Sequence, residues 1–346
     1  MVMHGVQSMN LNIQIFMNTA NSSYERDLLR DMHRGINQKL NPNNLPYLEW
    51  IESTNNDLSF NYIDKYKMPK DVDLAVMLGS WKPQRIKDWN NPGHNLHHYI
   101  RTLIARESRN FLCIETPLLN RQISNDHEYY RVGLNGFLAN DGIFIEPRKY
   151  PKDRLDELGI EFPGWKTKGD KIIIALQLPG DASMRNQDVN DWCLACVQQI
   201  RKLSNRPIDI RTHPGLGEKS WSYVTDLFRQ LQKLNLQDVK LVDGSVVNLQ
   251  DHFQDAYCLI GYTSGVCIDA VVNGIPVIAH DEGNFTYDIC EKYIDNIENI
   301  YDSLPSVEAT QQHLQNLAYH QWSREEMQTG QVWEHFAKIL EKNLVK

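Results

Sequence analysis

A chain of 346 residues has room for two domains of roughly 100–200 residues each. Its 41% hydrophobic and 23% charged residues are typical of a globular protein, and its net charge of −8 argues against a general polyanion binder without excluding a local basic face. No apolar run approaches the roughly 18–20 residues of a membrane span, and residues 1–10 lack the order of a signal peptide, so we expect no membrane partner.

The first half of the chain predicts strands and helices in a loose alternation. Strands are expected at 12–17, 73–79 and 111–115, and helices at about 22–40 and 95–108. This half therefore follows a strand–helix scheme, with less regular spacing than the second half.

The second half predicts a more regular alternation of strands and helices. Residues 171–178 form an apolar run that ends at Pro179 and Gly180, as expected of a strand buried on both faces. Strands and helices alternate after it, with strands at 207–212, 239–242, 257–262 and 275–279 and helices at 186–203, 220–234 and 264–273. This spacing predicts an α/β fold with a parallel, doubly wound sheet.

The segment 161–170 fits neither pattern and is expected to connect two domains. We therefore expect one domain at 1–165 and a second at 166–320. Residues 321–346 follow the second sheet as a helix that is expected to cross back to the first domain.

Most of the six cysteines lie inside apolar runs, which indicates reduced, buried thiols in a cytoplasmic protein. Cys193 and Cys196 form a CxxC pair, but the surrounding residues have the pattern of a helix and no second pair follows at suitable spacing. Packing in the core is therefore the favoured interpretation over a metal or redox role.

Polar residues gather at three predicted strand ends in the second half, at 177–184, 211–215 and 261–265. In open α/β sheets, ligands bind beyond the carboxyl ends of the strands. These three segments are therefore expected to meet at one ligand pocket.

The sharpest of these ends is Thr263-Ser264-Gly265, where a helix begins after a strand. A helix N-terminus offers unpaired N–H groups and a partial positive charge, which suit a phosphate, and the two hydroxyls add donors. The alternative is that Thr263 or Ser264 only caps the helix.

His213 stands before Pro214, which favours an extended conformation for His213, and Gly215 follows. An imidazole held beside a phosphate-binding turn suits donation to the phosphate and stabilisation of a leaving nucleotide. The alternative is a purely structural histidine.

The polar residues of these ends occur in a fixed order: Gln177, Asp181, Ser183, His213, Pro214, Thr263, Ser264, Gly265 and Asp269. Over about the C-terminal half, this order resembles capsule-polysaccharide glycosyltransferases, including Kdo transferases, and the His-Pro and Ser/Thr elements resemble those of sialyl- and polysialyltransferases. The resemblance implies a GT-B fold with two Rossmann-like domains facing a cleft, no metal or other cofactor, and a nucleotide-sugar donor activated by CMP or, as the alternative, UDP.

By the same resemblance, domain 166–320 binds the nucleotide-sugar through the ordered set, and domain 1–165 binds the acceptor. Two departures stand out. Asp269 occupies a position where the family often has Glu, which puts its ribose or base contacts in doubt. The segment 280–288 replaces an aromatic-rich stretch of the Kdo group, so the donor sugar is expected to differ from Kdo.

A hydroxyl acceptor must lose its proton as it attacks the anomeric carbon, and a carboxylate is the usual base. Two candidates lie in the first domain: Glu115, at the end of a predicted strand, and Asp141, before Gly142. Asp141-Gly142 is also an ordinary turn pair, which is the alternative for that residue.

The stretch from Lys82 to Lys149 carries ten basic and seven acidic residues, interleaved with tryptophan and tyrosine. Such a surface suits phosphate contacts with base stacking, sugar stacking, or no more than solvation. The expected acceptor contacts are Ser80, Trp81, Arg121 and Arg131.

Three functions therefore remain open. Viral enzymes of related architecture glycosylate hydroxymethylated pyrimidines in phage DNA, including with arabinose, and a DNA acceptor is slightly favoured because a basic amphipathic helix for reaching lipid-linked glycans is missing. The alternatives are a capsule or surface-polysaccharide transferase and a nucleotide-sugar epimerase. An inverting displacement is the simpler expectation, since one base suffices.

Overall fold

The chain forms two compact units, described here by a computed structural model. The model describes residues 11–20, 22–40, 71–79, 92–121, 127–216 and 221–344. The first unit holds the described residues up to Phe137 with Asp141–Arg148 and Tyr319–Lys346, and the second unit holds Leu138–Asn140 and Lys149–Ala318.

The segment expected to connect the domains belongs to the second unit, whose long continuous part runs from Lys149 to Ala318 and includes residues 161–170. The Trp165 side chain donates a hydrogen bond to the carbonyl of Pro305 at 2.9 Å. The main-chain N–H of Lys166 donates a hydrogen bond to the carbonyl of Gly274 at 2.7 Å. These bonds hold residues 161–170 against the body of the unit, although their sequence has neither strand nor helix spacing.

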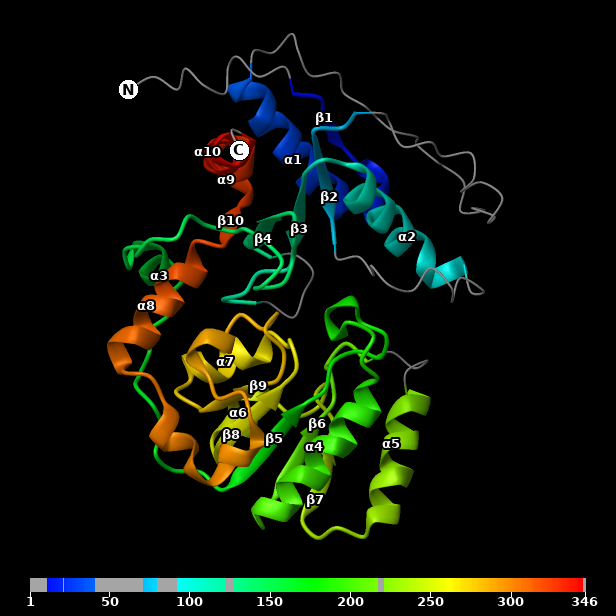
Figure 1. Ribbon diagram of the computed structural model, residues 1–346, viewed down its shortest axis with the longest axis vertical. Coiled ribbons are helices and arrows are strands. Elements are labelled where there is room, and N and C mark those ends of the chain that lie inside the picture. Colours follow the sequence, from blue (N-terminus) through cyan, green and yellow to red (C-terminus); the bar gives the residue numbers. More distant parts are fainter. Residues whose placement is uncertain are drawn as a thin grey trace. The chain divides into compact units, whose positions relative to one another are not determined.

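The first unit combines one mixed sheet with helices. Its elements are β1 (Ile13–Ile15), η2 (Met17–Thr19), α1 (Ser23–Lys39), β2 (Leu74–Leu78), α2 (Pro92–Glu107), β3 (Phe111–Glu115), β4 (Tyr129–Leu134), β10 (Gln321–Ser323), α9 (Arg324–Gln328) and α10 (Gln331–Leu344). The strand order is β1-β2-β3-β4-β10 (Figure 1).

Only β1, β2 and β3 of this sheet run parallel, whereas β4 is antiparallel to both β3 and β10. The sheet of the first unit is therefore mixed, with a parallel part at β1, β2 and β3. The described residues between β3 and β4 form no helix. Two parallel neighbouring strands are usually joined by a helical crossover, so β4 pairs with β3 in the antiparallel direction.

The end of the chain completes the first unit by packing on α1. Ser22 and Glu25 close a capping box at the start of α1, whose buried face includes Leu28, Met32 and Ile36. α9 and α10 pack on α1. A single helix was expected over 324–344, but it is interrupted at Gly330, which has φ +78°. A Cβ on Gly35 would lie 1.8 Å from the carbonyl oxygen of Met327, so only glycine permits this close approach.

The second unit is a parallel sheet with helices. Its elements are α3 (Asp153–Glu157), β5 (Lys171–Ala175), η4 (Ala182–Met184), α4 (Val189–Leu203), β6 (Ile208–Arg211), α5 (Trp221–Leu234), β7 (Val239–Val242), α6 (Leu249–Phe253), β8 (Ala256–Gly261), α7 (Val266–Val272), β9 (Val277–Ala279), η6 (Tyr287–Ile289), η7 (Ile294–Ser303) and α8 (Val307–Ala318).

The strand order of this sheet is β7-β6-β5-β8-β9, and all neighbours run parallel. β5 is the central strand, and Ile172, Ile173 and Ile174 on it are fully buried, as its continuous apolar run predicts. α4 and α5 lie side by side in Figure 1. Cys193 and Cys196 are buried in α4, in agreement with their interpretation as core residues. The α/β fold class is confirmed.

Candidate functional site

The carboxyl edge of the second unit's sheet holds a network of side-chain hydrogen bonds between the segments that follow β5 and β8. Gln177 follows β5, and its Oε1 accepts a hydrogen bond from the main-chain N–H of Thr263 at 3.0 Å. The other end of the same amide, Nε2, donates to the Thr263 hydroxyl at 3.1 Å. Gln177 and Thr263 are buried, so this pair fixes the turn after β8 to the end of β5.

Ser183 and Asp181 extend the network. Gln177 Nε2 also donates to Ser183 Oγ at 2.6 Å, and that hydroxyl donates to Asp181 Oδ1 at 2.9 Å. The Thr263 hydroxyl donates to the carbonyl of Ser183, again at 2.9 Å. The structure therefore joins the segments 177–183 and 261–265.

The turn at Thr263, Ser264 and Gly265 does not serve as a side-chain cap of α7. Gly265 is the N-cap residue and no side chain caps this helix, while Ser264 Oγ only accepts a long 3.4 Å bond from Val266. Among the described residues, the main-chain N–H groups of Ser264 and Gly265 have no acceptor. Two N–H donors and one hydroxyl are thus held at a fixed turn, which suits phosphate oxygens.

His213 lies on the same edge of the sheet, after β6, the other neighbour of β5. Its Nδ1 accepts a hydrogen bond from the main-chain N–H of Gly215 at 3.0 Å. The proton of a neutral ring therefore sits on Nε2, the atom that a phosphate contact requires. Pro214 beside it is exposed.

The bonds of segment 211–215 lead away from β8. Thr212 Oγ1 accepts from the N–H of Gly244 at 3.0 Å, and Arg211 donates to the carbonyls of Gly244 and Val247 at 3.1 and 2.9 Å. The meeting of all three segments at one pocket stays a prediction.

A fourth segment, 280–284, belongs to this edge and was not among the expected site residues. His280 follows β9, and its N–H donates to the carbonyl of Gly261 at 3.0 Å. The Asn284 side chain donates to the carbonyl of Tyr262 at 3.1 Å. The sequence could have indicated this residue, because 275–279 was predicted as a strand and His280 follows its carboxyl end, where ligands bind in such sheets.

A charged group accompanies this segment. Arg185 forms an ion pair with Asp281 at 3.4 Å and also bonds the Asn140 side chain, within the same unit. Asp281 accepts a hydrogen bond from Tyr262, and burial with this carboxylate raises the pKa of Tyr262 to about 12. Tyr262 therefore keeps its proton at neutral pH.

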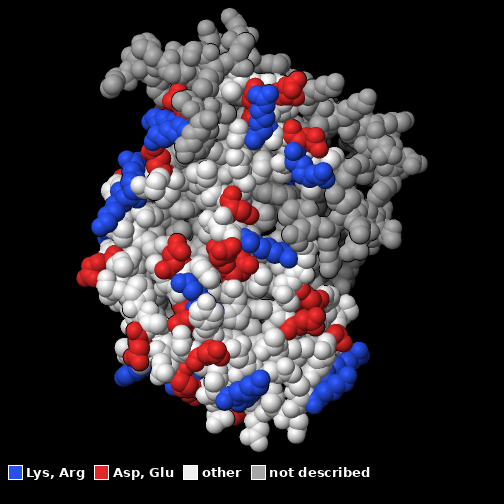
Figure 2. All heavy atoms as spheres, viewed as in Figure 1, with Lys and Arg blue, Asp and Glu red and all other residues white. Residues whose placement is uncertain are grey.

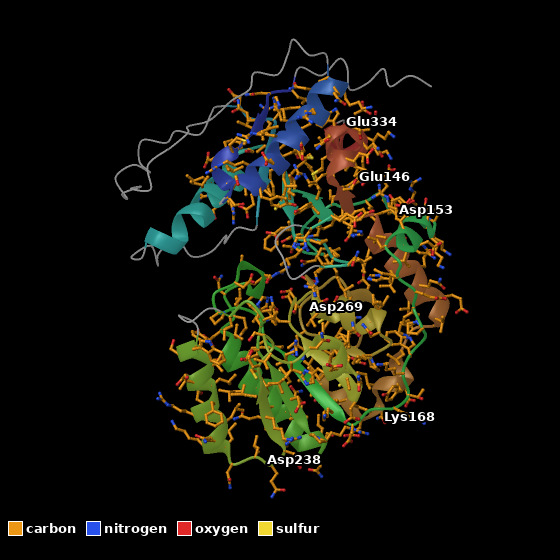
Figure 3. All side chains as sticks on the ribbon, turned by 180° about the vertical axis from the view of Figure 1, so that it is seen from behind. Glu146, Asp153, Lys168, Asp238, Asp269 and Glu334 are labelled. Atoms are coloured by element: carbon orange, nitrogen blue, oxygen red, sulfur yellow. The ribbon has the colours of Figure 1, made fainter. Side chains whose placement is uncertain are left out.

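Asp269 lies on α7 and is half-buried. Figure 3 shows it toward the opposite end of the second unit from Asp238 and Lys168, which precede β7 and β5. Asp269 therefore lies away from the amino edge of the sheet, and its expected contact with ribose or base stays a prediction.

The carboxyl edge of the first unit's sheet is built on charge. Glu115 ends β3 directly opposite Arg131 on β4, and their side chains form an ion pair with 3.8 Å between Oε2 and Nη2. Only 10% of the Arg131 side chain and 17% of the Glu115 side chain are exposed. Arg131, expected as an acceptor contact, is thus placed where it orients Glu115.

A second buried cation lies beside this pair. The Arg101 guanidinium donates to the carbonyl of Thr19 at 2.8 Å and occupies the space over Gly79, where a Cβ would lie 2.4 Å from its central carbon. The Cys113 thiol donates to the carbonyl of Gly79 at 3.3 Å. Burial chiefly, with Glu115 nearby, raises the pKa of Cys113, so this thiol stays protonated.

The other expected residues of the first unit are exposed or lie outside the described residues. Asp141 and Arg121 are exposed, and both are close enough to Arg131 to influence its pKa, which burial lowers. Ser80 and Trp81 lie outside the described residues. On the face in Figure 2, basic and acidic side chains of the described part are interspersed.

Two further properties bear on the chemistry. Within the residues that the structure describes, no group of three or more His, Cys, Asp or Glu side chains is arranged to hold a metal ion. No helix in the described ranges has the length and apolar character needed to cross a bilayer.

Comparisons with known proteins give the following picture. No protein-family model and no curated protein matches the sequence. The chain is similar to a solved structure of Thermosulfurimonas dismutans KpsC, a beta Kdo 2,7 transferase, with 15% identity, coverage of 97% of this chain and 100% of that chain, and a TM-score of 0.46.

It is also similar to the glycotransferase of kitacinnamycin, with 12% identity over 78% of this chain and 70% of that chain and a TM-score of 0.28. A third solved structure, TarM, shares 15% identity over 82% of this chain and 56% of that chain, again with a TM-score of 0.28. The first two of these solved structures are named as transferases.

Proposed function

We propose that the chain is a glycosyltransferase that moves a sugar from a nucleotide-sugar to a hydroxyl acceptor. The observation that carries this proposal is the buried network of Gln177, Ser183 and Thr263, which holds the N–H groups of Ser264 and Gly265 without an acceptor among the described residues. Donors fixed in advance stabilise a charge that develops during a reaction, because they need no reorganisation.

The charge that these donors match is that of a leaving phosphate. The Ser264 hydroxyl and the Nε2–H of His213 add donors at the same sheet edge. We favour a CMP-activated sugar, with UDP as the alternative, following the resemblance of the motif order. Hydrogen-bond donors alone then offset the phosphate charge, so transfer is expected to proceed without a metal ion.

The transfer step is a single displacement. The acceptor oxygen forms a bond to the anomeric carbon while the bond from that carbon to the phosphate oxygen breaks, and its electron pair leaves with the phosphate. The acceptor proton passes to a carboxylate, for which we favour Glu115 over Asp141 because Glu115 is half-buried and oriented by Arg131. One displacement inverts the anomeric centre.

The favoured acceptor is a 5-hydroxymethylated pyrimidine in phage DNA. Supporting it, five basic side chains between Arg101 and Lys149 are exposed, and basic side chains suit contacts with phosphates: Arg106, Arg109, Arg121, Arg148 and Lys149. The interspersed charges in Figure 2 favour the second candidate, a surface polysaccharide, because they form no basic patch on the described part of that face.

The test begins with thermal stabilisation of the full chain by CMP-, UDP- and GDP-sugars, since a ligand bound only to the folded state raises the melting temperature. The stabilising donor is then incubated with hydroxymethylated duplex DNA, with unmodified DNA as the control, and with oligosaccharides, each with and without EDTA. Sugar transfer that resists EDTA supports the proposal. Turnover of the donor without any acceptor would favour an epimerase, and no stabilisation by any nucleotide would end the proposal.

A further inference from the structure

The His280 imidazole is held through Nδ1 by a neighbour that can only donate. The indole Nε1–H of Trp192, on α4, donates to His280 Nδ1 at 2.9 Å, and the Cys196 sulfur lies 3.8 Å from the same atom. An indole nitrogen never accepts a hydrogen bond, so Nδ1 must carry its lone pair toward Trp192. The proton of the neutral ring is therefore on Nε2.

The surroundings also keep this ring neutral. Burial lowers the pKa of His280, and a proton on Nδ1 would face the Trp192 N–H and break their bond. Burial raises the pKa of Cys196 to about 12, so the neighbouring sulfur stays a thiol. Asp281, the nearest acid on the same segment, is engaged by Arg185 and Tyr262.

Nε2 remains available to a ligand. His280 Nε2 has no hydrogen-bond partner among the described residues. It is also not fully buried, so it reaches solvent. His280 sits beside the 261–265 turn, because its N–H bonds the Gly261 carbonyl and the Trp192 ring contacts both His280 and Tyr262, with centroids 5.9 and 6.0 Å away.

We propose that His280 binds the phosphate of the nucleotide-sugar donor through its Nε2–H, and that Trp192 is the positioning residue that fixes the tautomer. This inference rests on the proposed function and adds to it a residue outside the expected set. A neutral imidazole donates a hydrogen bond without releasing a proton, so its contribution to phosphate binding does not vary with pH near neutrality.

The test is calorimetric titration of the full chain with CMP, and with UDP if CMP does not bind, at pH 7.5. In His280→Asn, the amide oxygen takes the place of Nδ1 and keeps the Trp192 bond, while the Nε2 donor is lost. We expect Kd to rise about ten- to a hundredfold. In His280→Gln, the amide nitrogen reaches the place of Nε2, and we expect recovery to within about fivefold of the wild type.

The pH dependence of Trp192→Phe separates positioning from packing. Phe fills much of the same volume but donates nothing, so the ring takes either tautomer and protonates when an anionic phosphate is near. We expect the nucleotide affinity of Trp192→Phe to fall at pH 8 and to recover toward pH 6. The affinity of the wild type is expected to stay constant over this pH range. In both cases the effect of phosphate ionisation is removed by comparison with His280→Asn. A purely structural role for Trp192 would weaken binding equally at both pH values.

The outcomes distinguish the two proposals. A wild-type chain that binds neither nucleotide would overturn the proposed function and this inference together. Wild-type binding with an unchanged Kd in His280→Asn would overturn the inference alone. A third outcome is binding that is lost in His280→Asn and not restored in His280→Gln, together with a nucleotide affinity of Trp192→Phe that does not vary with pH. This outcome would make His280 a structural residue and would also overturn the inference.

Discussion

The two sheet edges of this molecule use opposite chemistry at comparable places. In the first unit, a carboxylate at the end of β3 is oriented by a buried guanidinium, Glu115 with Arg131. In the second unit, the ends of β5 and β8 are joined by the uncharged side chains of Gln177, Ser183 and Thr263. The first arrangement fixes one charged side chain, whereas the second fixes a stretch of backbone and leaves its N–H groups for a ligand.

This difference fits the two tasks that we propose for these strand ends. A general base needs a fixed orientation toward the acceptor, and the Arg131 guanidinium, 3.8 Å from Glu115, restrains that carboxylate. A phosphate site needs donors, and a carboxylate facing it would repel the ligand. In the second unit, amide and hydroxyl groups join β5 to β8. The two carboxylates nearby are engaged within the protein, Asp181 by Ser183 and Asp281 by Arg185 and Tyr262.

The largest expected effect comes from breaking the charged edge. Glu115→Gln removes the favoured base and is expected to lower kcat about a hundred- to ten-thousandfold, with the Kd of the donor unchanged. Asp141→Asn is the matched control and is expected to stay within about fivefold of the wild type. The measurement is steady-state transfer alongside donor titration, and the opposite ranking of the two variants would move the base to Asp141.

The second effect concerns the neutral edge. His213→Ala removes an expected phosphate contact and should lower kcat/KM about a hundredfold or more through weaker donor binding and slower transfer, with the fold retained. In His213→Asn, the amide oxygen still accepts from Gly215, so loop support is kept while the Nε2 donor is lost. Both variants should be impaired alike, and full activity of His213→Asn would reduce His213 to a loop support.

A smaller effect is expected from opening the network itself. Thr263→Val removes a buried hydroxyl that bonds Gln177 and Ser183, and it should lower the free energy of unfolding by about 1–3 kcal/mol. Thr225→Val is the control, because that hydroxyl is exposed on α5 and bonds only the carbonyl of Trp221. Denaturant unfolding of both variants measures the difference, and equal midpoints would show that the network adds no stability.

The smallest effect is a pH dependence concentrated in the second unit. Burial lowers the pKa of His252, His280 and His313 there, and that of His33 in the first unit. Unfolding releases these rings to a pKa of about 6.5, so the unfolded chain binds more protons below that pH. The stabilisation is complete above pH 6.5 and declines as the pH falls toward the folded pKa values.

Unfolding midpoints at pH 7.5 and 5.5 test this sign. We expect a lower midpoint at pH 5.5, with amide exchange speeding up more in the second unit than in the first. A midpoint that rises or stays constant between these pH values would show that the histidines are not held neutral by the fold.

The sequence predicted the second unit more closely than the first, and the reason is physical. β5 is buried on both faces, so its apolar run marks it without reference to any partner. β10 has three residues and exists because it pairs with β4 from a distant part of the chain, with Gln321 opposite Arg131. Such pairing leaves little periodicity in either segment, and residues 321–346 were predicted as a helix.

The same distinction applies to the site. Gln177 and Thr263 were expected because both follow buried parallel strands, and the structure bonds them to each other. The pairing of Glu115 with Arg131 depends on an antiparallel register that spacing alone does not reveal. His280 was noticed only as part of a departure from a family pattern, although its place after β9 satisfies the strand-end rule that identified the others.

The most direct measurement is amide hydrogen exchange of the full chain with and without saturating CMP or UDP. The account predicts that exchange slows at Ser264 and Gly265, whose N–H groups have no acceptor among the described residues, and in the 280–284 segment bonded to that turn. Nucleotide binding that slows exchange elsewhere and leaves these amides unchanged would contradict it.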